Sequence, residues 1–325
     1  MMKKYSCLSA VLFSVFMFVA LSAQEFPLVK YVPAGTEYVI SVDVAKLRSL
    51  PVWTGLRNDP DSSQKINDIL HDYRINPERI DQFMFVGGGK NLRGALMKVN
   101  IPENELVENF KKLGGNRYSE GMVGEKSVVF VSTDESIPSE RRKIGFLYLT
   151  SDTVLATEDV YFNKFLAGME EAKLIRPEIV IPKNDVVAWS YINTKSINKS
   201  RKKGNSNDMA DMAVSGVNNI FAELNFTGPD QKGIDLTAEA SCRDENAVML
   251  LNMQLAGLMT LGNSFLFTDN PQLGEEWLKK FKFTPNGKKL SGKLAFDGAF
   301  AEKISAHFKE VAAKHMTPPD PGAGQ

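Results

Sequence analysis

The chain of 325 residues has only two cysteines, and this shortage limits how it can be held together. Cys7 lies in an apolar N-terminal segment, which leaves Cys242 as the one thiol in the rest of the sequence. A single thiol cannot form an intramolecular disulfide, so we expect the fold to depend on burial of apolar side chains. We expect Cys242 to be a small buried strand residue, with a reactive nucleophile as the alternative.

Histidine is equally scarce, and the three present are not spaced as metal ligands. His307 and His315 are eight residues apart on one predicted helix, which separates them by about 12 Å along its axis. We expect them, and His71, to be surface or boundary residues. No G-x-S-x-G motif occurs, so an esterase of the α/β-hydrolase type lacks its main motif, although a triad built from distant segments stays open. We assign no catalytic, cofactor-binding or metal-binding residue.

A long apolar run occurs only once with the features of an export signal. Residues 1–23 have a basic start, an apolar stretch over 8–21 and small residues at the end, in the order of a secretory signal peptide. The apolar stretch of about 14 residues is too short for the roughly 20 that span a bilayer. We therefore expect cleavage near Ser22 or Ala23 and export to the periplasm or the medium, with no transmembrane segment in the mature chain.

The chain also lacks an excess of charge of either sign, with 39 basic and 39 acidic residues. Cleavage removes two lysines and no acid, which gives 37 − 39 = −2. A chain this close to neutral has no global field to attract nucleic acid or anionic lipid, so we predict no nucleic-acid partner. Cys7 precedes most of the apolar stretch, where a lipoprotein cysteine would follow it, and lipid attachment is not expected.

The order of predicted elements in the first half recurs in the second. Each half opens with a proline-led turn and a β-rich strand, over 38–43 and 186–193. A hairpin follows in each, over 83–99 and 221–241, and alternation of apolar and polar residues predicts one solvent-facing side in both. A helix follows each hairpin, and a further hairpin and helix end each half.

We therefore predict an α+β fold with two similar units, residues 26–176 and 177–316, each a mostly antiparallel sheet with packed helices. Residues 317–325 are rich in proline and glycine and are predicted to be a disordered tail. This layout resembles exported bacterial proteins of unknown function that are built from two tandem α+β units. The resemblance implies no known activity and carries over no catalytic residue. Whether the two units share one sheet is left open.

A glycine-rich segment, Gly87-Gly88-Gly89-Lys90, invites comparison with a phosphate-binding loop. Such a loop requires G-x-x-x-x-G-K-[ST] and a helix directly after it, so that the helix N-terminus points at the anion. Here Asn91 follows the lysine, and the next residues alternate as a strand does. The segment is therefore predicted to be a hairpin turn.

One concentrated basic run stands out in the sequence, at Lys199, Arg201, Lys202 and Lys203. We take these four residues as candidates for contact with an anionic surface or a partner. The alternative is a solvated loop, because no aromatic residues alternate with the basic ones to stack on bases or sugars.

The predicted helix over 247–261 is apolar nearly all round, so we expect it to be covered on several sides. Two roles are open for it. It is either a core helix packed between other elements, or the wall of an apolar groove that takes a lipid or a partner helix through its adaptable methionines.

These observations favour an exported, non-enzymatic protein that binds another protein or a component of the cell envelope. A hydrolase of polymers is the first alternative, with carboxylates meeting at the interface of the two units. The closely spaced acid pairs in the sequence are candidates of low specificity, because helix dipoles and solvation explain them equally well: Glu103 and Glu105, Glu170 and Glu171, Glu275 and Glu276. A carrier of an apolar ligand, built around 247–261, is the second alternative.

Overall fold

The fold is taken from a computed structural model, which describes residues 26–60, 62–64, 75–89, 92–112, 117–132, 143–174, 179–182, 186–194 and 215–316, for the last of these without the side chains of 312–316. The predicted signal peptide, the tail 317–325 and the basic run with Lys199, Arg201, Lys202 and Lys203 lie outside the described residues.

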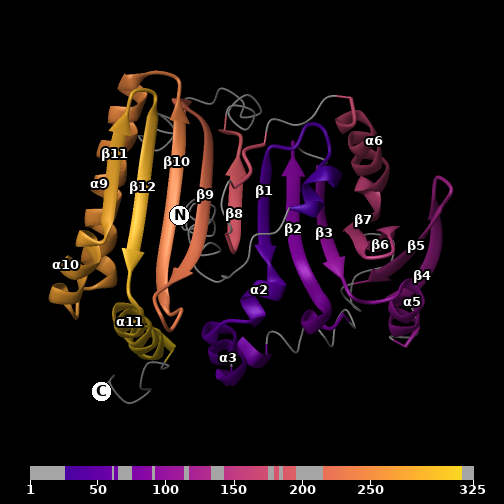
Figure 1. Ribbon diagram of the computed structural model, residues 1–325, viewed down its shortest axis with the longest axis horizontal. Helices are drawn as coiled ribbons and strands as arrows, with labels where there is room; N and C mark the ends of the chain where they lie inside the picture. Colours follow the sequence, from indigo (N-terminus) through magenta and orange to yellow (C-terminus); the bar gives the residue numbers. More distant parts are fainter. Residues whose placement is uncertain are drawn as a thin grey trace, which may run out of the picture.

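The described strands form one antiparallel sheet of twelve strands, in the order β11-β12-β10-β9-β8-β1-β2-β3-β7-β6-β5-β4 (Figure 1). Neighbouring strands all run antiparallel, as expected for a sheet connected mostly by hairpins. The strands are β1 (Tyr38–Asp43), β2 (Ile80–Gly88), β3 (Leu92–Val99), β4 (Tyr118–Val123), β5 (Lys126–Ser132), β6 (Lys143–Thr150), β7 (Thr153–Glu158), β8 (Ala188–Ile192), β9 (Val217–Thr227), β10 (Gly233–Cys242), β11 (Phe281–Asn286) and β12 (Lys289–Phe296).

The α-helices lie mainly toward the two ends of this sheet (Figure 1). They are α2 (Val44–Arg48), α3 (Pro51–Asn58), α5 (Glu103–Lys111), α6 (Phe162–Ala172), α9 (Glu245–Leu266), α10 (Pro271–Lys279) and α11 (Gly298–Met316), with short 3-10 turns η1 (Pro27–Tyr31), η2 (Pro77–Arg79) and η4 (Asp159–Tyr161). Several begin at side-chain caps: Asp43 accepts from the backbone N–H of Lys46, and Asp244 from that of Ala247. Sheet and helices together make the α+β fold that the sequence predicts.

The two halves of the chain share this one sheet. Strand β1 pairs with β8 from Tyr38 opposite Ile192 to Val42 opposite Ala188, so backbone hydrogen bonds join the halves directly. Hairpin β2–β3 follows on one side of this pair and hairpin β9–β10 on the other. The predicted units 26–176 and 177–316, and their similarity to each other, stay predictions.

One face of the sheet is packed with helices at both ends. Helix α5 covers strands β3, β5, β6 and β7 through Leu106 and Phe110. At the other end, α9, α10 and α11 cover β10, β11 and β12 on the same face, with Val248, Trp277 and Phe300 among the buried side chains. Coverage of the second face of the sheet differs from strand to strand.

Among the described residues, the second face is covered from β8 and β1 across to β4. There η1 and α6 bury an apolar layer that includes Met84, Val86 and Leu96. The predicted solvent-facing side of the first hairpin is therefore wrong, because Leu96 is fully buried on one face while Met97 is buried on the other. The prediction is confirmed for β10, where Asp235, Thr237, Glu239 and Ser241 are all partly exposed; these residues alternate with the apolar ones that face α9 and α11.

The predicted hairpin turn at Gly87 to Lys90 is consistent with the strands on either side. Strands β2 and β3 pair antiparallel up to Gly88 opposite Leu92, and a strand, not a helix, follows the turn. Gly89 has φ +54°, in the region that favours glycine. Residues Lys90 and Asn91 lie outside the described residues. A phosphate loop needs a helix at this place, so the described geometry does not support one.

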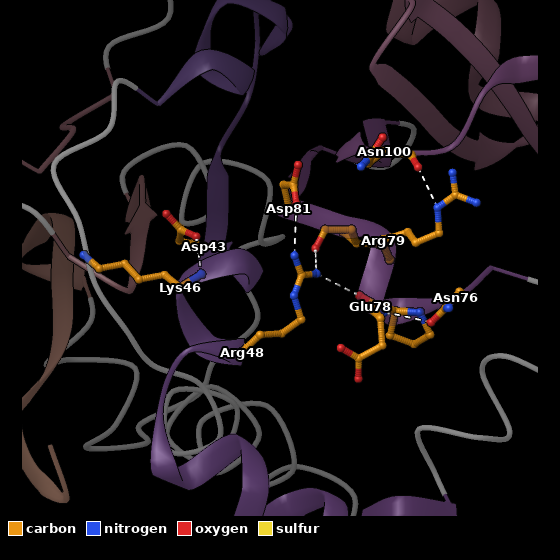
Figure 2. Close-up of polar contacts among 10 residues, drawn as sticks. Asp43, Lys46, Arg48, Asn76, Glu78, Arg79, Asp81 and Asn100 are labelled. Carbon is orange, nitrogen blue, oxygen red and sulfur yellow. Dashed lines mark hydrogen bonds and ion pairs between the residues drawn. The ribbon is translucent and has the colours of Figure 1, made fainter. Parts of the chain in front are cut away.

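A polar cluster fixes α2 to the start of β2 (Figure 2). The Arg48 guanidinium donates to the carbonyl oxygens of Pro77 (3.3 Å) and Ile80 (2.5 Å), and it pairs with Asp81 at 3.0 Å. Next to it, Arg79 donates to the carbonyl oxygen of Asn100 at 2.6 Å and pairs with Glu105. Because both guanidinium groups satisfy backbone carbonyls that strand pairing leaves free, we interpret the cluster as structural.

Candidate contact surface

The predicted chemical residues that the structure describes lie apart from one another. Cys242 is buried at the end of β10, as predicted, and burial raises the pKa of its thiol, with Asp244 adding to the effect. His307 is buried, contrary to the expected surface position. Its Nε2 lies 2.7 Å from the carbonyl oxygen of Leu266, and its ring stacks on Phe267 at 4.9 Å between centroids. Neither residue is placed as an accessible nucleophile or base.

The predicted carboxylate pairs have structural partners instead. Glu105 pairs with Arg79, and the carboxylate of Glu170 accepts from the Nζ of Lys173 at 2.7 Å. Glu276 lies 3.9 Å from Lys303, between α10 and α11. The boundary between the halves is the β1–β8 strand pair, so the predicted interface for opposed carboxylates is a hydrogen-bonded sheet.

A different group of side chains gathers on the second face of the sheet, beyond the edge of η1 and α6. We call it the open polar face and define it as the side of strands β9, β10, β12 and β11 opposite α9. Among the described residues, no helix packs on it. It contains the following polar side chains, all at least partly exposed: Asn219, Glu223, Asn225, Asp235, Thr237, Glu239, Ser241, Lys282, Thr284, Lys289, Ser291 and Lys293.

Charges on the open polar face are segregated by strand. The acids Glu223, Asp235 and Glu239 are on the inner strands β9 and β10, whereas the lysines are on the outer strands β12 and β11. Two ion pairs cross between β12 and β10, Lys293 with Asp235 at 2.8 Å and Lys289 with Glu239 at 2.7 Å. The face therefore presents an acidic strip next to a basic strip.

The acidic strip has hydrogen-bonding capacity that the described residues leave unused. Asp235 uses Oδ2 for Lys293, while its Oδ1 is buried without a partner. Glu223 accepts from Thr237, yet burial raises the pKa of its carboxyl because no cation is paired with it among the described residues. Buried polar atoms without partners are uncommon, so the Oδ1 of Asp235, next to the partly buried carboxyl of Glu223, marks a place where an external donor would be stabilised.

The indole of Trp189 borders the same strip. In the β8–β9 register Trp189 lies directly opposite Glu223, so both side chains are on one face of the sheet. The ring packs edge-on against Phe26 at 5.7 Å, and its Nε1–H has no partner among the described residues. Trp189 thus marks the inner border of the open polar face, across the strand pair from Glu223.

Sequence alternation identified only part of this surface. The wet positions of β10 were predicted, but Glu223, Trp189 and the lysines of β12 were not singled out. Glu223 and the lysines of β12 share one signal, polar residues at alternate positions of strands 217–227 and 289–296, which Phe221 and Ala295 interrupt. Only the strand order, which places β12 beside β10, shows that these residues belong to one surface.

Among the described residues, no group of three or more His, Cys, Asp and Glu side chains is arranged to hold a metal ion. No helix in the same residues combines the length and apolar character needed to cross a membrane. Comparison of the chain with protein-family models, curated proteins and solved structures finds no match.

Proposed function

We propose that this is an exported, non-enzymatic protein that binds another protein of the cell envelope through the open polar face. The observation that carries the proposal is the unpaired Oδ1 of Asp235 beside the partly buried carboxyl of Glu223, on a face that no described helix covers. A partner that supplies a basic or amide donor to the acidic strip would satisfy this oxygen atom. It would also remove the free-energy cost of leaving it unpaired.

The charge pattern supports a protein partner over a glycan. Glycan binding commonly uses exposed aromatic faces, but Trp189 and Tyr191 are only 3% and 2% exposed. Adjacent acidic and basic strips instead favour a partner surface with the opposite order of charge, which fixes its orientation on the sheet. Export is supported by the order of residues in 1–23 and would place the face in the envelope or outside it.

Site-specific photocrosslinking in cells that export the protein tests this proposal. A photoreactive residue is placed at Thr284 or Ser291 on the open polar face, and at Leu174, which is 88% exposed at the end of α6, as a control. We expect a discrete adduct from the first two positions that is absent from the third. Adding Lys293→Glu, which replaces one of the three lysines of the basic strip with an acid, should remove the adduct. The same adducts from all three positions would contradict the proposal.

Hydrolysis remains a second candidate because of one observation on the same face. Glu223 and Asp235 are diagonal neighbours across β9 and β10, a geometry with about 7 Å between side chains. A raised pKa on Glu223 suits a proton donor, and the second carboxylate, Asp235, lies 2.8 Å from Lys293. Release of fragments from envelope polymers that Glu223→Gln abolishes would support this candidate, whereas no release by the unaltered protein would remove it.

The carrier alternative has less support from the position of α9. A carrier needs an apolar cavity that encloses its ligand. The apolar side chains of α9 that do not face the sheet are instead exposed on the outside of the helix, among them Met253 and Phe265. A convex apolar helix is suited to contact with another surface.

A further inference from the structure

Helix α9 exposes an apolar ridge that none of the other described elements covers. The sequence predicted a helix covered on several sides, but only Ala247 and Val248 of its residues are buried. Six large apolar side chains on it are between 45% and 80% exposed: Met249, Met253, Leu258, Leu261, Phe265 and Leu266. The expected all-round covering is therefore wrong, because the sheet contacts only the side of α9 that carries Val248, Leu251 and Leu255.

The ridge has an internal symmetry centred on Gly257. Residues spaced four apart lie in one row on a helix, and here that row reads Met249, Met253, Gly257, Leu261, Phe265. When the row is reversed, methionines exchange with Leu261 and Phe265 and the glycine stays in place. An antiparallel copy of the same helix therefore sets a bulky side chain against a bulky side chain and Gly257 against Gly257.

The sizes of these side chains suit two helices that cross at Gly257. Rows of this kind pack at interaxial angles near −50°, so two crossed helices approach closest at one point and diverge to either side. A Cβ built on Gly257 meets nothing within 4 Å, so the closest point is open for a second backbone. Larger side chains then fill the widening space toward each end of the row.

Two hydroxyl groups beside the ridge are already satisfied within the helix. The Thr260 hydroxyl donates to the carbonyl oxygen of Ala256 at 3.0 Å, and the Ser264 hydroxyl donates to that of Thr260 at 3.0 Å. No charged residue occurs from Asn246 to Thr268. Burial of this side of α9 would thus leave no charged group without a partner, and it would break few hydrogen bonds with water.

We infer that the ridge of α9 is a homodimer interface, in which two copies of the chain cross at Gly257 about a twofold axis. The exposed area is compatible with this occupant: at roughly 200 Å² for a large side chain, the four large residues of the row, Met249, Met253, Leu261 and Phe265, expose on the order of 500 Å², which is what one partner contributes at the lower limit for a specific interface. The acids at the two ends, Glu245 and Asp269, disfavour an anionic membrane, which amphipathic helices bind through lysine and arginine.

The dimer has a consequence for the open polar face. The ridge points away from the sheet, and the open polar face is on the opposite side of the sheet from α9. A twofold axis through the ridge places the two sheets back to back, with both open polar faces outward. Each dimer would then offer two equivalent binding surfaces, which raises avidity for a partner present in more than one copy.

Cysteine crosslinking tests the position of the axis. The chain from Gln24 onward retains all described residues, and its own Cys242 is 3% exposed. Residues on a twofold axis face their own copies, so Gly257→Cys should form an intermolecular disulfide under mild oxidation, at least about tenfold faster than Gly262→Cys. Gly262 is a matched control because it is on the same helix, off the row, with nothing within 4 Å of its built Cβ.

Sedimentation velocity tests the affinity with variants that keep the fold. We expect the unaltered chain to sediment as a dimer, Gly257→Val to shift it to monomer, and Gly262→Val to leave the dimer intact. Circular dichroism should show equal helix content in both variants. A monomer at all concentrations, or equal crosslinking of the two cysteine variants, would overturn the inference. Binding of the unaltered chain to zwitterionic vesicles, lost in Gly257→Val without any dimer, would assign the ridge to lipid instead.

Discussion

The two ends of the sheet bury their strands in different ways. At the covered end, formed by β1 to β7, helix α5 packs on one face and α6 with η1 on the other. At the open end, formed by β9 to β12, helices α9, α10 and α11 pack on one face only. The second face of the covered end consists of residues such as Met84 and Leu96, whereas that of the open end has Glu223 and Asp235. A second layer is present where it has apolar surface to bury.

The covered end also shows how closely its second layer fits. A Cβ built on Gly94 of β3 would lie 2.6 Å from the ring of Phe165, and one on Gly145 of β6 only 2.3 Å from that of Phe162. Both phenylalanines of α6 are fully buried. Helix α6 thus packs over Gly94 and Gly145, which have no side chains to keep its two phenylalanine rings from the backbone of the sheet. The polar residues on the second face of the open end provide no such close contact for a helix.

The largest expected effect comes from emptying the second layer of the covered end. Phe162→Ala should destabilise the protein by about 3 to 5 kcal/mol, because it removes a fully buried ring and leaves a cavity between α6 and the sheet. Phe221→Ala at the border of the open end should cost no more than about 2 kcal/mol, because that ring is half-exposed. Urea denaturation followed by circular dichroism measures both, and equal losses would contradict the comparison.

A smaller effect is expected from adding one methyl group. Gly145→Ala should cost about 1 to 3 kcal/mol, because the new Cβ overlaps the Phe162 ring and α6 must shift. The matched change Gly292→Ala, on β12 of the open end, meets its nearest atom in Phe283 at 3.3 Å and should cost less than about 1 kcal/mol. Thermal unfolding of the two variants provides the test. If Gly292→Ala proves the more damaging, the open end is packed as tightly as the covered end.

The sequence predicts which strand face is exposed at the open end, but not at the covered end. In β10, apolar and polar residues alternate strictly, and the structure confirms one wet face. In β3, Leu96 stands at a position that the pattern assigned to solvent, since Lys98 and Asn100 follow it at the same spacing. A single leucine does not reveal that α6, more than sixty residues later, packs above it.

The candidate surface was less predictable for a related reason. The basic run with Lys199, Arg201, Lys202 and Lys203 is a candidate from the sequence alone, because its charges are close together there. The open polar face consists of single charges on four strands, which only the strand order brings together. Likewise, the apolar composition of α9 predicts a buried helix. Its exposed row is identified only from the structure, in which the sheet packs against one side of the helix.

The smallest expected effect concerns one carboxyl of the open polar face and depends on pH. Burial raises the folded-state pKa of Glu223 above its usual value of 4.5. Between the unfolded and folded pKa values the folded state holds more protons, so this group makes stability fall as pH rises through that window. Glu223→Gln should remove the fall and stabilise the protein at neutral pH by less than about 1 kcal/mol, because solvent screens a partly exposed group. Glu239→Gln is the control, since Lys289 already neutralises that carboxylate. Urea midpoints measured from pH 4 to pH 8 compare the two. A bound partner with a basic donor would stabilise ionised Glu223 and reverse the slope, so the same titration with partner present also tests whether the open polar face is where it binds.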